Sequence, residues 1–211
     1  MMMIIGAPAL CLLVCLPLFM YYKRSLRLPL ASLFKSVGTL CAMIPALVAA
    51  IKLNPRCYIC VAALALYAAA DFALEFHTFL GAGFFIAGHV CYIAYFLQLF
   101  PVSVIHLVCL LALLGILAYV LYKNRKEIDR QLAPFSVYGA VLCAMSSCAI
   151  GCITSFTSQG IMIAAGGALF FISDYILLHR TLYSAGIAVS WIIMITYYAA
   201  QLLIGLSCLF I

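Results

Sequence analysis

Apolar stretches of about 20 residues recur along the whole chain, and they constrain the fold more than any other feature of the sequence. Each is long enough to cross a hydrocarbon core of about 30 Å as an α-helix. Of the 211 residues, 69% are hydrophobic and only 8% are charged, and the mean hydropathy is +1.29. Ordinary soluble domains contain about 25% charged residues, so this composition excludes a soluble enzyme. The sequence predicts an all-α polytopic membrane protein.

Eight membrane spans account for nearly all of the sequence. We place them at residues 2–22, 29–51, 57–76, 80–100, 102–122, 134–154, 160–178 and from 183 or later to 211. Trp191 is a natural interface anchor and favours a start of the last span near residue 190. No Lys or Arg precedes the first span and no small-x-small cleavage site follows it, so we expect it to stay in the mature chain. The short connections predict a single integral membrane domain over residues 1–211.

Lys and Arg are distributed unevenly between the two sides of the predicted bundle. Two of them, Lys52 and Arg56, lie on one side. The loops on the other side carry Lys23, Arg24, Arg27, Lys123, Arg125, Lys126, Arg130 and Arg180. Cytoplasmic loops are enriched in such residues, so we expect both termini outside, in the plasma membrane of a bacterium. The net charge of +6 then reflects topology and attraction to anionic lipids, and we expect no nucleic-acid partner.

The eleven cysteines do not indicate a redox or metal site. Nearly all lie within the predicted spans, where a thiol acts as a small apolar packing residue. The one C-x-x-C pair, Cys57 and Cys60, has no second pair at zinc spacing. We therefore expect neither a metal nor a cofactor.

An internal repeat is visible when the chain is shifted by 103 residues against itself. The shift aligns Asp71 with Asp174 and brings further identical residues together in the 30 positions from Asp71. Among these pairs are Leu74 and Leu177, Thr78 and Thr181, Ala82 and Ala185, Gly83 and Gly186, Tyr95 and Tyr198, and Gln98 and Gln201. A parallel duplication of a four-span unit is therefore predicted, with halves of about 1–101 and 102–211.

The two aligned aspartates are the candidate catalytic residues. A carboxylate at the centre of a membrane helix costs about 2.5–3.5 kcal/mol, so one that persists there usually has a function. At about 1.5 Å per residue, Asp71 and Asp174 should lie roughly 6–8 Å inside the cytoplasmic ends of their helices. That is the depth of the glycerol backbone of a lipid. A carboxylate pair in this setting is suited to general acid–base chemistry.

Other polar side chains are expected to reach the same level and to bind a substrate. They are Lys35, His89, Tyr92, Tyr197, Tyr198 and Gln201. Simpler roles remain open for three residues. Lys35 would then extend to the interface, His89 would link two helices by a hydrogen bond, and Glu75, one turn after Asp71, would lie in water at a helix end.

Four segments resemble the YhhN family of eight-span membrane proteins, which includes the lysoplasmalogenases. They are GALFFISDYILL at 167–178, ITYYAAQLLI at 195–204, FIAGHVCYIAYF at 85–96 and AADFALEF at 69–76. The match through Ser173-Asp174 and through Tyr197-Tyr198-x-x-Gln201 is the most specific. The chain differs from the usual family pattern at Ala70, where Gly is usual, and at Ser36, where Pro is usual.

The resemblance implies hydrolysis of the vinyl ether bond of a lysoplasmalogen, a single-chain lysophospholipid. Such a bond is cleaved by protonating its β-carbon, after which water attacks the oxocarbenium ion. One protonated acid and one anionic group are needed, and two carboxylates can provide them. Which aspartate is the acid stays open at this point. The alternatives are a proton-coupled transporter and a non-catalytic lipid-binding membrane protein.

Overall fold

The computed structural model describes residues 2–128, 131–183 and 186–210, with side chains from residue 6, and contains helices but no strand within these ranges. The first span consists of α1 (Met2–Leu10), a π-helical turn (Cys11–Cys15) and α2 (Leu16–Arg24). The others are α3 (Leu28–Lys52), α4 (Cys57–Leu74), α5 (Thr78–Leu99), α6 (Val104–Lys123), α8 (Leu132–Gly151), α9 (Ser158–Tyr183) and α10 (Ile187–Ser207). Short 3-10 turns extend α8 to Ser155 and α10 to Phe210, and the short α7 (Arg125–Ile128) links α6 to α8. Within the described ranges, eight helices are long and apolar enough to span a membrane, which confirms the predicted fold class.

The helix boundaries follow local sequence signals. Pro29 lies in the first turn of α3, where its missing N–H is not needed. Ser103 is the N-cap residue of α6, and its backbone N–H donates to Nδ1 of His106, the third helical residue, at 3.0 Å. Gly186 precedes α10, which starts at Ile187, a few residues before the predicted position near 190.

Helix α9 corrects the predicted depth of Asp174. It continues to Tyr183 instead of ending at 178, because no Gly or Pro interrupts the segment after Leu178. Asp174 therefore lies nine residues, or about 14 Å, before the end of its helix. Asp71 lies three residues before the end of α4. The two carboxylates are thus placed differently along their own helices.

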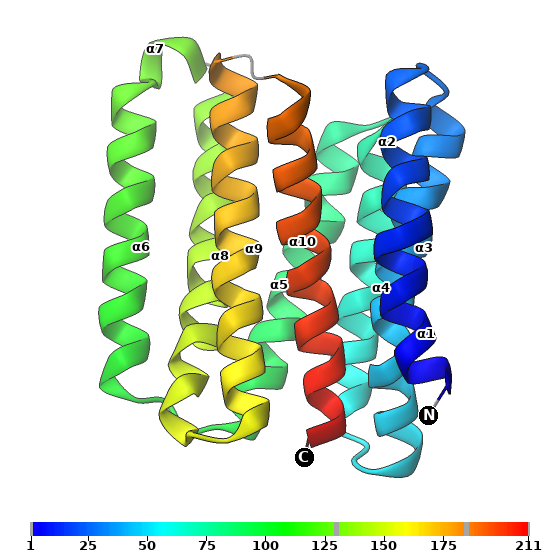
Figure 1. Cartoon of the computed structure of the whole chain (residues 1–211). Helices are drawn as coiled ribbons and strands as arrows, with labels where there is room; N and C mark the ends of the chain where they lie inside the picture. The colour runs from blue at the N-terminus through cyan, green and yellow to red at the C-terminus, as the bar shows by residue number, and fades with distance from the viewer. Residues whose placement is uncertain (1, 129–130, 184–185, 211) are drawn as a thin grey trace.

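The helices pack in an order that joins the two halves of the chain mainly at two contacts (Figure 1). In the first half, α2 packs on α3, α3 on α4, and α4 on α5; in the second half, α6 packs on α8, α8 on α9, and α9 on α10. Contacts of α3 with α10 and of α5 with α8 connect the halves. Exchanging the halves leaves this pattern of neighbours unchanged, as a repeat would require. The repeat itself stays a prediction.

The contact between α3 and α10 is close because of small residues. A Cβ on Gly205 would lie 2.1 Å from the carbonyl oxygen of Ala42, and one on Gly38 would lie 2.7 Å from the ring of Tyr198. Small residues let membrane helices approach in this way. The contact brings the polar side chains of α10 against those of α3 and α4.

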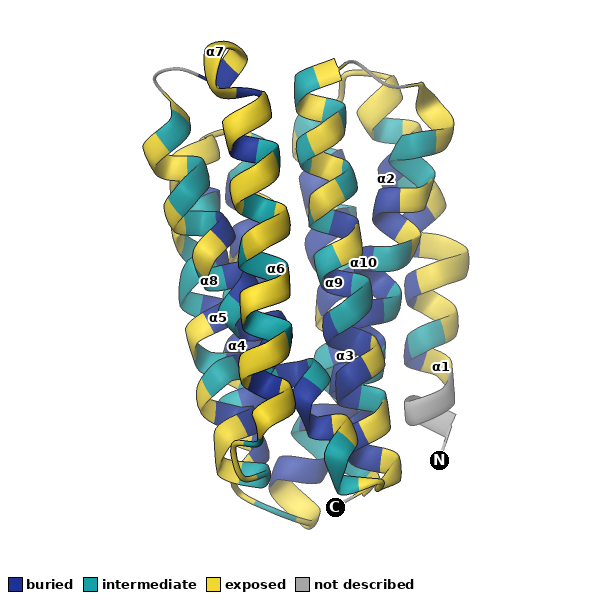
Figure 2. Ribbon diagram, turned by 90° about the vertical axis from the view of Figure 1, so that its left-hand side faces the viewer, coloured by how far each residue is buried: buried dark blue, intermediate teal, exposed yellow. Residues whose placement is uncertain are grey.

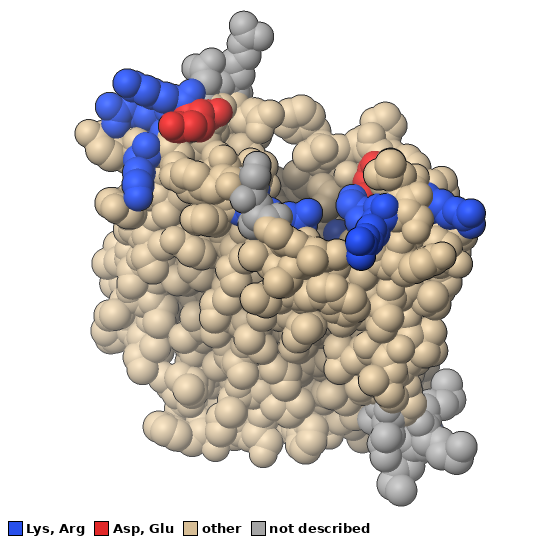
Figure 3. Space-filling model, turned by 45° about the horizontal axis from the view of Figure 1, so that its top comes forward, with Lys and Arg blue, Asp and Glu red and all other residues tan. Residues whose placement is uncertain are grey.

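Charge and burial both vary across the molecule. The two termini lie at one end of the bundle (Figure 1), and Lys and Arg gather at the other end around a hollow (Figure 3). Helix α6 is the least buried span, with exposed apolar residues along most of its length (Figure 2). Eight of the eleven cysteines are buried and all are free thiols, in keeping with a packing role.

Candidate functional site

A cavity of about 470 Å³ extends between α5, α6, α8, α9 and α10 and reaches Lys35 of α3. Its volume is typical of small-molecule sites, which range over about 300–1,000 Å³. Thr78, Gln131 and Thr181 line it toward the basic end of the bundle, and most of the remaining wall is apolar. The polar groups deeper in the wall are Lys35, Tyr138, Ser173, Asp174 and Tyr197.

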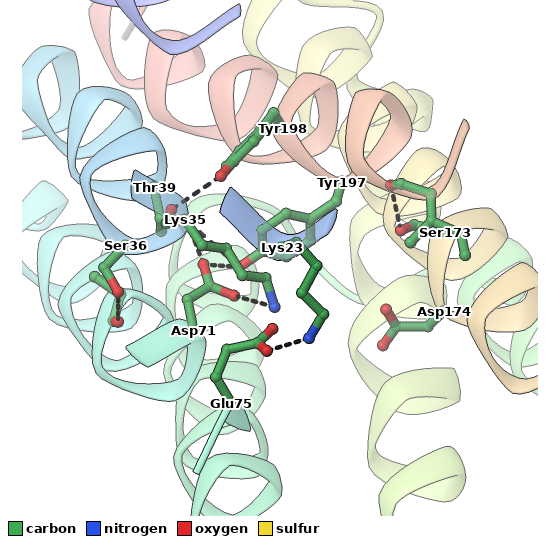
Figure 4. A network of polar contacts seen from close by, with 12 residues as sticks. Lys23, Lys35, Ser36, Thr39, Asp71, Glu75, Ser173, Asp174, Tyr197 and Tyr198 are labelled. Atoms are coloured by element: carbon green, nitrogen blue, oxygen red, sulfur yellow. Dashed lines mark hydrogen bonds and ion pairs between the residues drawn. The ribbon is translucent and has the colours of Figure 1, made fainter. Parts of the chain in front are cut away.

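Asp71 lies behind this wall and is fully buried. Its Oδ1 is 3.1 Å from Nζ of Lys35. Its Oδ2 accepts hydrogen bonds from the hydroxyl of Thr39 at 2.5 Å and from the hydroxyl of Tyr197 at 2.8 Å (Figure 4). All three neighbours present donors, so the site binds Asp71 as a carboxylate. Of this group, Lys35 and Tyr197 line the cavity and Asp71 does not.

Lys35 is held in place from several directions. The hydroxyl of Tyr198 donates to the carbonyl of Lys35 at 3.0 Å, and the hydroxyl of Ser36 donates to the carbonyl of Ala68 at 2.9 Å. These bonds fix α3 against α10 and α4. The Lys35 side chain is only 10% exposed and its Nζ lies 5.9 Å from the centre of the Tyr197 ring. Lys35 therefore faces the cavity and does not extend to the interface.

Asp174 faces the same cavity from α9. Its Oδ2 accepts a hydrogen bond from the hydroxyl of Tyr138, and no other described residue donates to it. The preceding residue, Ser173, donates to the carbonyl of Ile193 at 2.9 Å and fixes α9 against α10. In Figure 4 the carboxyl group of Asp174 is turned toward the group formed by Lys35, Asp71 and Tyr197. One carboxyl group is thus presented to the cavity opposite an ion pair.

The other predicted site residues lie deeper and do not line the cavity. The hydroxyl of Tyr67 is 2.6 Å from Nδ1 of His89, whose ring is fully buried and 5.6 Å from the ring of Tyr138. The hydroxyl of Tyr92 donates to Oε1 of Gln201 at 2.8 Å. The structure therefore brings Lys35, Asp71, Tyr197 and Tyr198 together and places Asp174 opposite them. His89, Tyr92 and Gln201 form a deeper buried layer.

Two residues of the site, Tyr138 and Thr39, are not among the residues predicted from the sequence. Tyr138 could have been predicted, because the 103-residue shift that aligns the aspartates also aligns Lys35 with Tyr138. Each half then carries an aspartate bound by its equivalent neighbour, Lys35 in one half and Tyr138 in the other. Thr39 follows Lys35 by one helical turn and so shares its face of α3.

Glu75 is not a free helix-end residue in water. Its side chain is 7% exposed and forms an ion pair with Lys23, which is at the end of α2 (Figure 4). The end of α2 covers the end of α4 here. The pair lies at the basic end of the bundle beside the Lys35–Asp71 pair.

The donor set favours acid–base chemistry. No cluster of three or more His, Cys, Asp or Glu side chains suited to a metal lies among the residues that the structure describes. The site offers one carboxyl group with a free oxygen, one ammonium and two phenols beside apolar space.

The model of the YhhN family matches residues 30–208, which is most of the chain and includes every residue of this site. No curated protein and no solved structure matches the chain.

Proposed function

Because the chain belongs to the YhhN family, we propose that it is a membrane-embedded hydrolase that cleaves the vinyl ether bond of lysoplasmalogens. The products are a fatty aldehyde and a glycerophospho-alcohol. The observation that carries the proposal is the carboxyl group of Asp174, which faces an apolar cavity opposite the Lys35–Asp71 ion pair. A single-chain lipid has its reactive bond between a charged head and a hydrocarbon tail. The cavity likewise has polar side chains, including Lys35, in one part of its wall and apolar side chains over most of the rest.

Asp174 is the proposed acid. Among the residues that the structure describes, it has only a phenol as partner, while Asp71 is already bound to a cation. In the first step the Asp174 carboxyl donates its proton to the β-carbon of the vinyl ether, and the α-carbon and ether oxygen become an oxocarbenium ion. The Asp174 carboxylate then lies beside the cation and stabilises it.

Water completes the reaction without another reagent. The Asp174 carboxylate accepts a proton from the water that attacks the α-carbon, which restores the acid and forms a hemiacetal. The hemiacetal hydroxyl loses its proton as the C–O bond breaks, and the leaving glycerol oxygen gains one. The sum is one water consumed for one aldehyde and one alcohol released.

Asp71 acts through its neighbours in this proposal. Its carboxylate fixes Lys35 and Tyr197, and these two side chains touch the cavity. The ammonium of Lys35 is placed to donate hydrogen bonds to glycerol or phosphate oxygens of the head group. The division assigns the proton transfer to Asp174 and the positioning of the head-group ligands to Asp71.

A substrate panel tests the reaction. Purified protein is incubated with a lysoplasmalogen and with its alkyl-ether and ester counterparts of equal chain length. We expect aldehyde from the vinyl ether alone, because only its β-carbon can take the proton. Fatty acid released from the ester at a comparable rate would identify an esterase instead.

Isotopes test the mechanism in the same assay. In D₂O, one deuterium should appear on C2 of the aldehyde, which is trapped as it forms. In H₂¹⁸O, the glycerophospho-alcohol should gain no ¹⁸O, because the bond that breaks lies between the ether oxygen and the vinyl carbon. Labelled alcohol would contradict the mechanism. A transporter or a lipid-binding protein would give binding or uptake of lipid with neither product.

A further inference from the structure

Helix α6 closes one side of the cavity incompletely. It packs mainly against α8, where a Cβ on Gly139 would meet the side chain of Leu117 and one on Gly151 would meet the ring of His106. These contacts hold α6 close to α8 in the first turn of α6 and again in its second half. The side of α6 that faces α9 lacks a comparable contact and carries exposed apolar residues (Figure 2).

An open apolar groove runs along the outer surface between α6 and α9. Ala112, Gly115 and Tyr119 of α6 line it, together with four residues that line the inner cavity as well. These four are Ile116, Val120, Phe171 and Tyr175. One thin wall of side chains therefore separates the groove from the cavity.

The wall stands beside the proposed acid. Phe171 and Tyr175 flank Asp174 on α9 at positions three before and one after it, and their rings are 6.4 Å apart and nearly parallel. On the α6 side, a Cβ on Gly115 would meet nothing within 4 Å. The groove lies well inside both spans and thus at a depth where hydrocarbon surrounds the protein.

We propose that the α6–α9 groove is a side entrance that admits one hydrocarbon chain of a lysolipid from the bilayer into the cavity. This proposal rests on the proposed function for the identity of the lipid. The chain passes between Ile116 and Val120 of α6 and Phe171 and Tyr175 of α9, while the head group stays at the basic end of the bundle. The reactive bond then lies beside Asp174, where the inner cavity meets the wall.

The occupant is a single apolar chain for three reasons. The lining shared by groove and cavity is hydrocarbon and aromatic, without a charged group. The inner cavity combines this apolar lining with Lys35 at its other side, which suits a lipid and not a protein segment. The groove also borders the cavity across this wall of side chains, so a chain that displaces them has space ahead of it.

The test uses a lysophospholipid with a non-cleavable alkyl-ether chain that carries a diazirine near its end. After illumination of the full-length protein in bilayers, mass spectrometry locates the adducts. We expect adducts in residues 112–120 and 171–175 and in cavity residues such as Phe135 and Leu142. The variant Gly115→Trp, which fills the groove without a backbone clash, should reduce the cavity adducts at least fivefold.

Gly83→Trp is the matched control. Gly83 lies in a membrane span and lines neither the groove nor the cavity, and a Cβ on it would meet nothing within 4 Å. It should leave the cavity adducts unchanged. Equal cavity labelling in Gly115→Trp and Gly83→Trp would overturn the entrance. A dimeric wild type with a monomeric Gly115→Trp would overturn it as well, because the groove would then be a contact between two copies. The probe cannot be cleaved, so its adducts test the entrance independently of the reaction. The expected adducts without any aldehyde from a lysoplasmalogen would refute the proposed hydrolase and leave the entrance standing.

Discussion

At the scale of single residues, the two candidate aspartates have different partners, which is why we propose different roles for them. Asp71 is paired with Lys35 and accepts bonds from two hydroxyl groups, whereas Asp174 has Tyr138 as its described partner and faces the cavity. The predicted repeat aligns the two positions, and their partners differ, an ammonium for Asp71 and a phenol for Asp174. One carboxylate forms an ion pair, and we propose the other as the acid.

The Lys35–Asp71 pair should be strongly coupled. Lys35→Met or Asp71→Asn leaves the other member charged and buried, which typically costs about 3–5 kcal/mol, so each should unfold at a clearly lower temperature in detergent. The double variant should recover most of the lost stability and none of the activity. Lys126→Met is the control, since Lys126 is exposed in the short helix α7, away from the buried pair. Single variants as stable as Lys126→Met would show that the buried pair is not formed.

Tyr138 should orient Asp174. Tyr138→Phe removes the hydroxyl that donates to Asp174, and a hydrogen bond to a charged group contributes about 1.5–3 kcal/mol. We expect kcat to fall about tenfold or more with little change in KM, measured as aldehyde release. Tyr122→Phe, on the exposed face of α6, should match the wild type. A wild-type kcat in Tyr138→Phe would remove Tyr138 from the site.

The sequence identified the ionisable members of the site better than the neutral ones. Asp71, Asp174 and Lys35 stand out because a charge in an apolar run is costly, so its presence is a signal. Tyr138 and Thr39 carry no such cost, and similar residues occur throughout the spans. The depth of Asp174 was mispredicted because the polar residues after Leu178 continue the helix, and hydropathy alone cannot place a helix end.

At the scale of elements, the close contact between α3 and α10 positions the site. It places Tyr197 and Tyr198 of α10 against Asp71 and Lys35. The shared face of Lys35 and Thr39 follows from helical periodicity alone. The pairing of α3 with α10 is a contact between segments far apart in the chain, and no local pattern predicts it.

Gly205→Ala should loosen this contact. The new Cβ would lie 2.1 Å from a backbone carbonyl, which cannot rotate away, and overpacking of this kind costs about 1–3 kcal/mol. We expect a lower unfolding temperature in detergent and reduced activity. Gly83→Ala adds the same methyl group in open space, so its unfolding temperature should stay equal or rise slightly. Equal stability of the two variants would contradict the close approach of α3 and α10.

At the scale of the whole molecule, the number of spans and the distribution of charge fit together. Eight spans bring the described ends of the chain to one end of the bundle, and most Lys and Arg lie at the other (Figure 1, Figure 3). Composition and periodicity were enough to predict this architecture, because each span must satisfy its backbone internally and remain apolar outside. The orientation of the bundle in the membrane stays a prediction.

Reporter fusions in a bacterial host test that orientation. Alkaline phosphatase fused after the last residue should be active and a green fluorescent protein there should stay dark, since the basic loops are expected in the cytoplasm. Fusions after Tyr183, at the basic end of α9, should give the opposite pattern. A fluorescent C-terminal fusion would reverse the predicted topology and place the mouth of the cavity outside.

The rate of aldehyde release by Asp174→Asn tests the central claim most directly. The amide keeps the shape of the side chain and cannot donate a proton as the acid does. Loss of general acid catalysis typically lowers a rate about 10²–10⁴-fold, so we predict a decrease of at least a hundredfold with an unchanged unfolding temperature. Glu127→Gln, an acid-to-amide change in α7 outside the cavity, should retain the wild-type rate. Aldehyde release by folded Asp174→Asn at the wild-type rate would contradict the account.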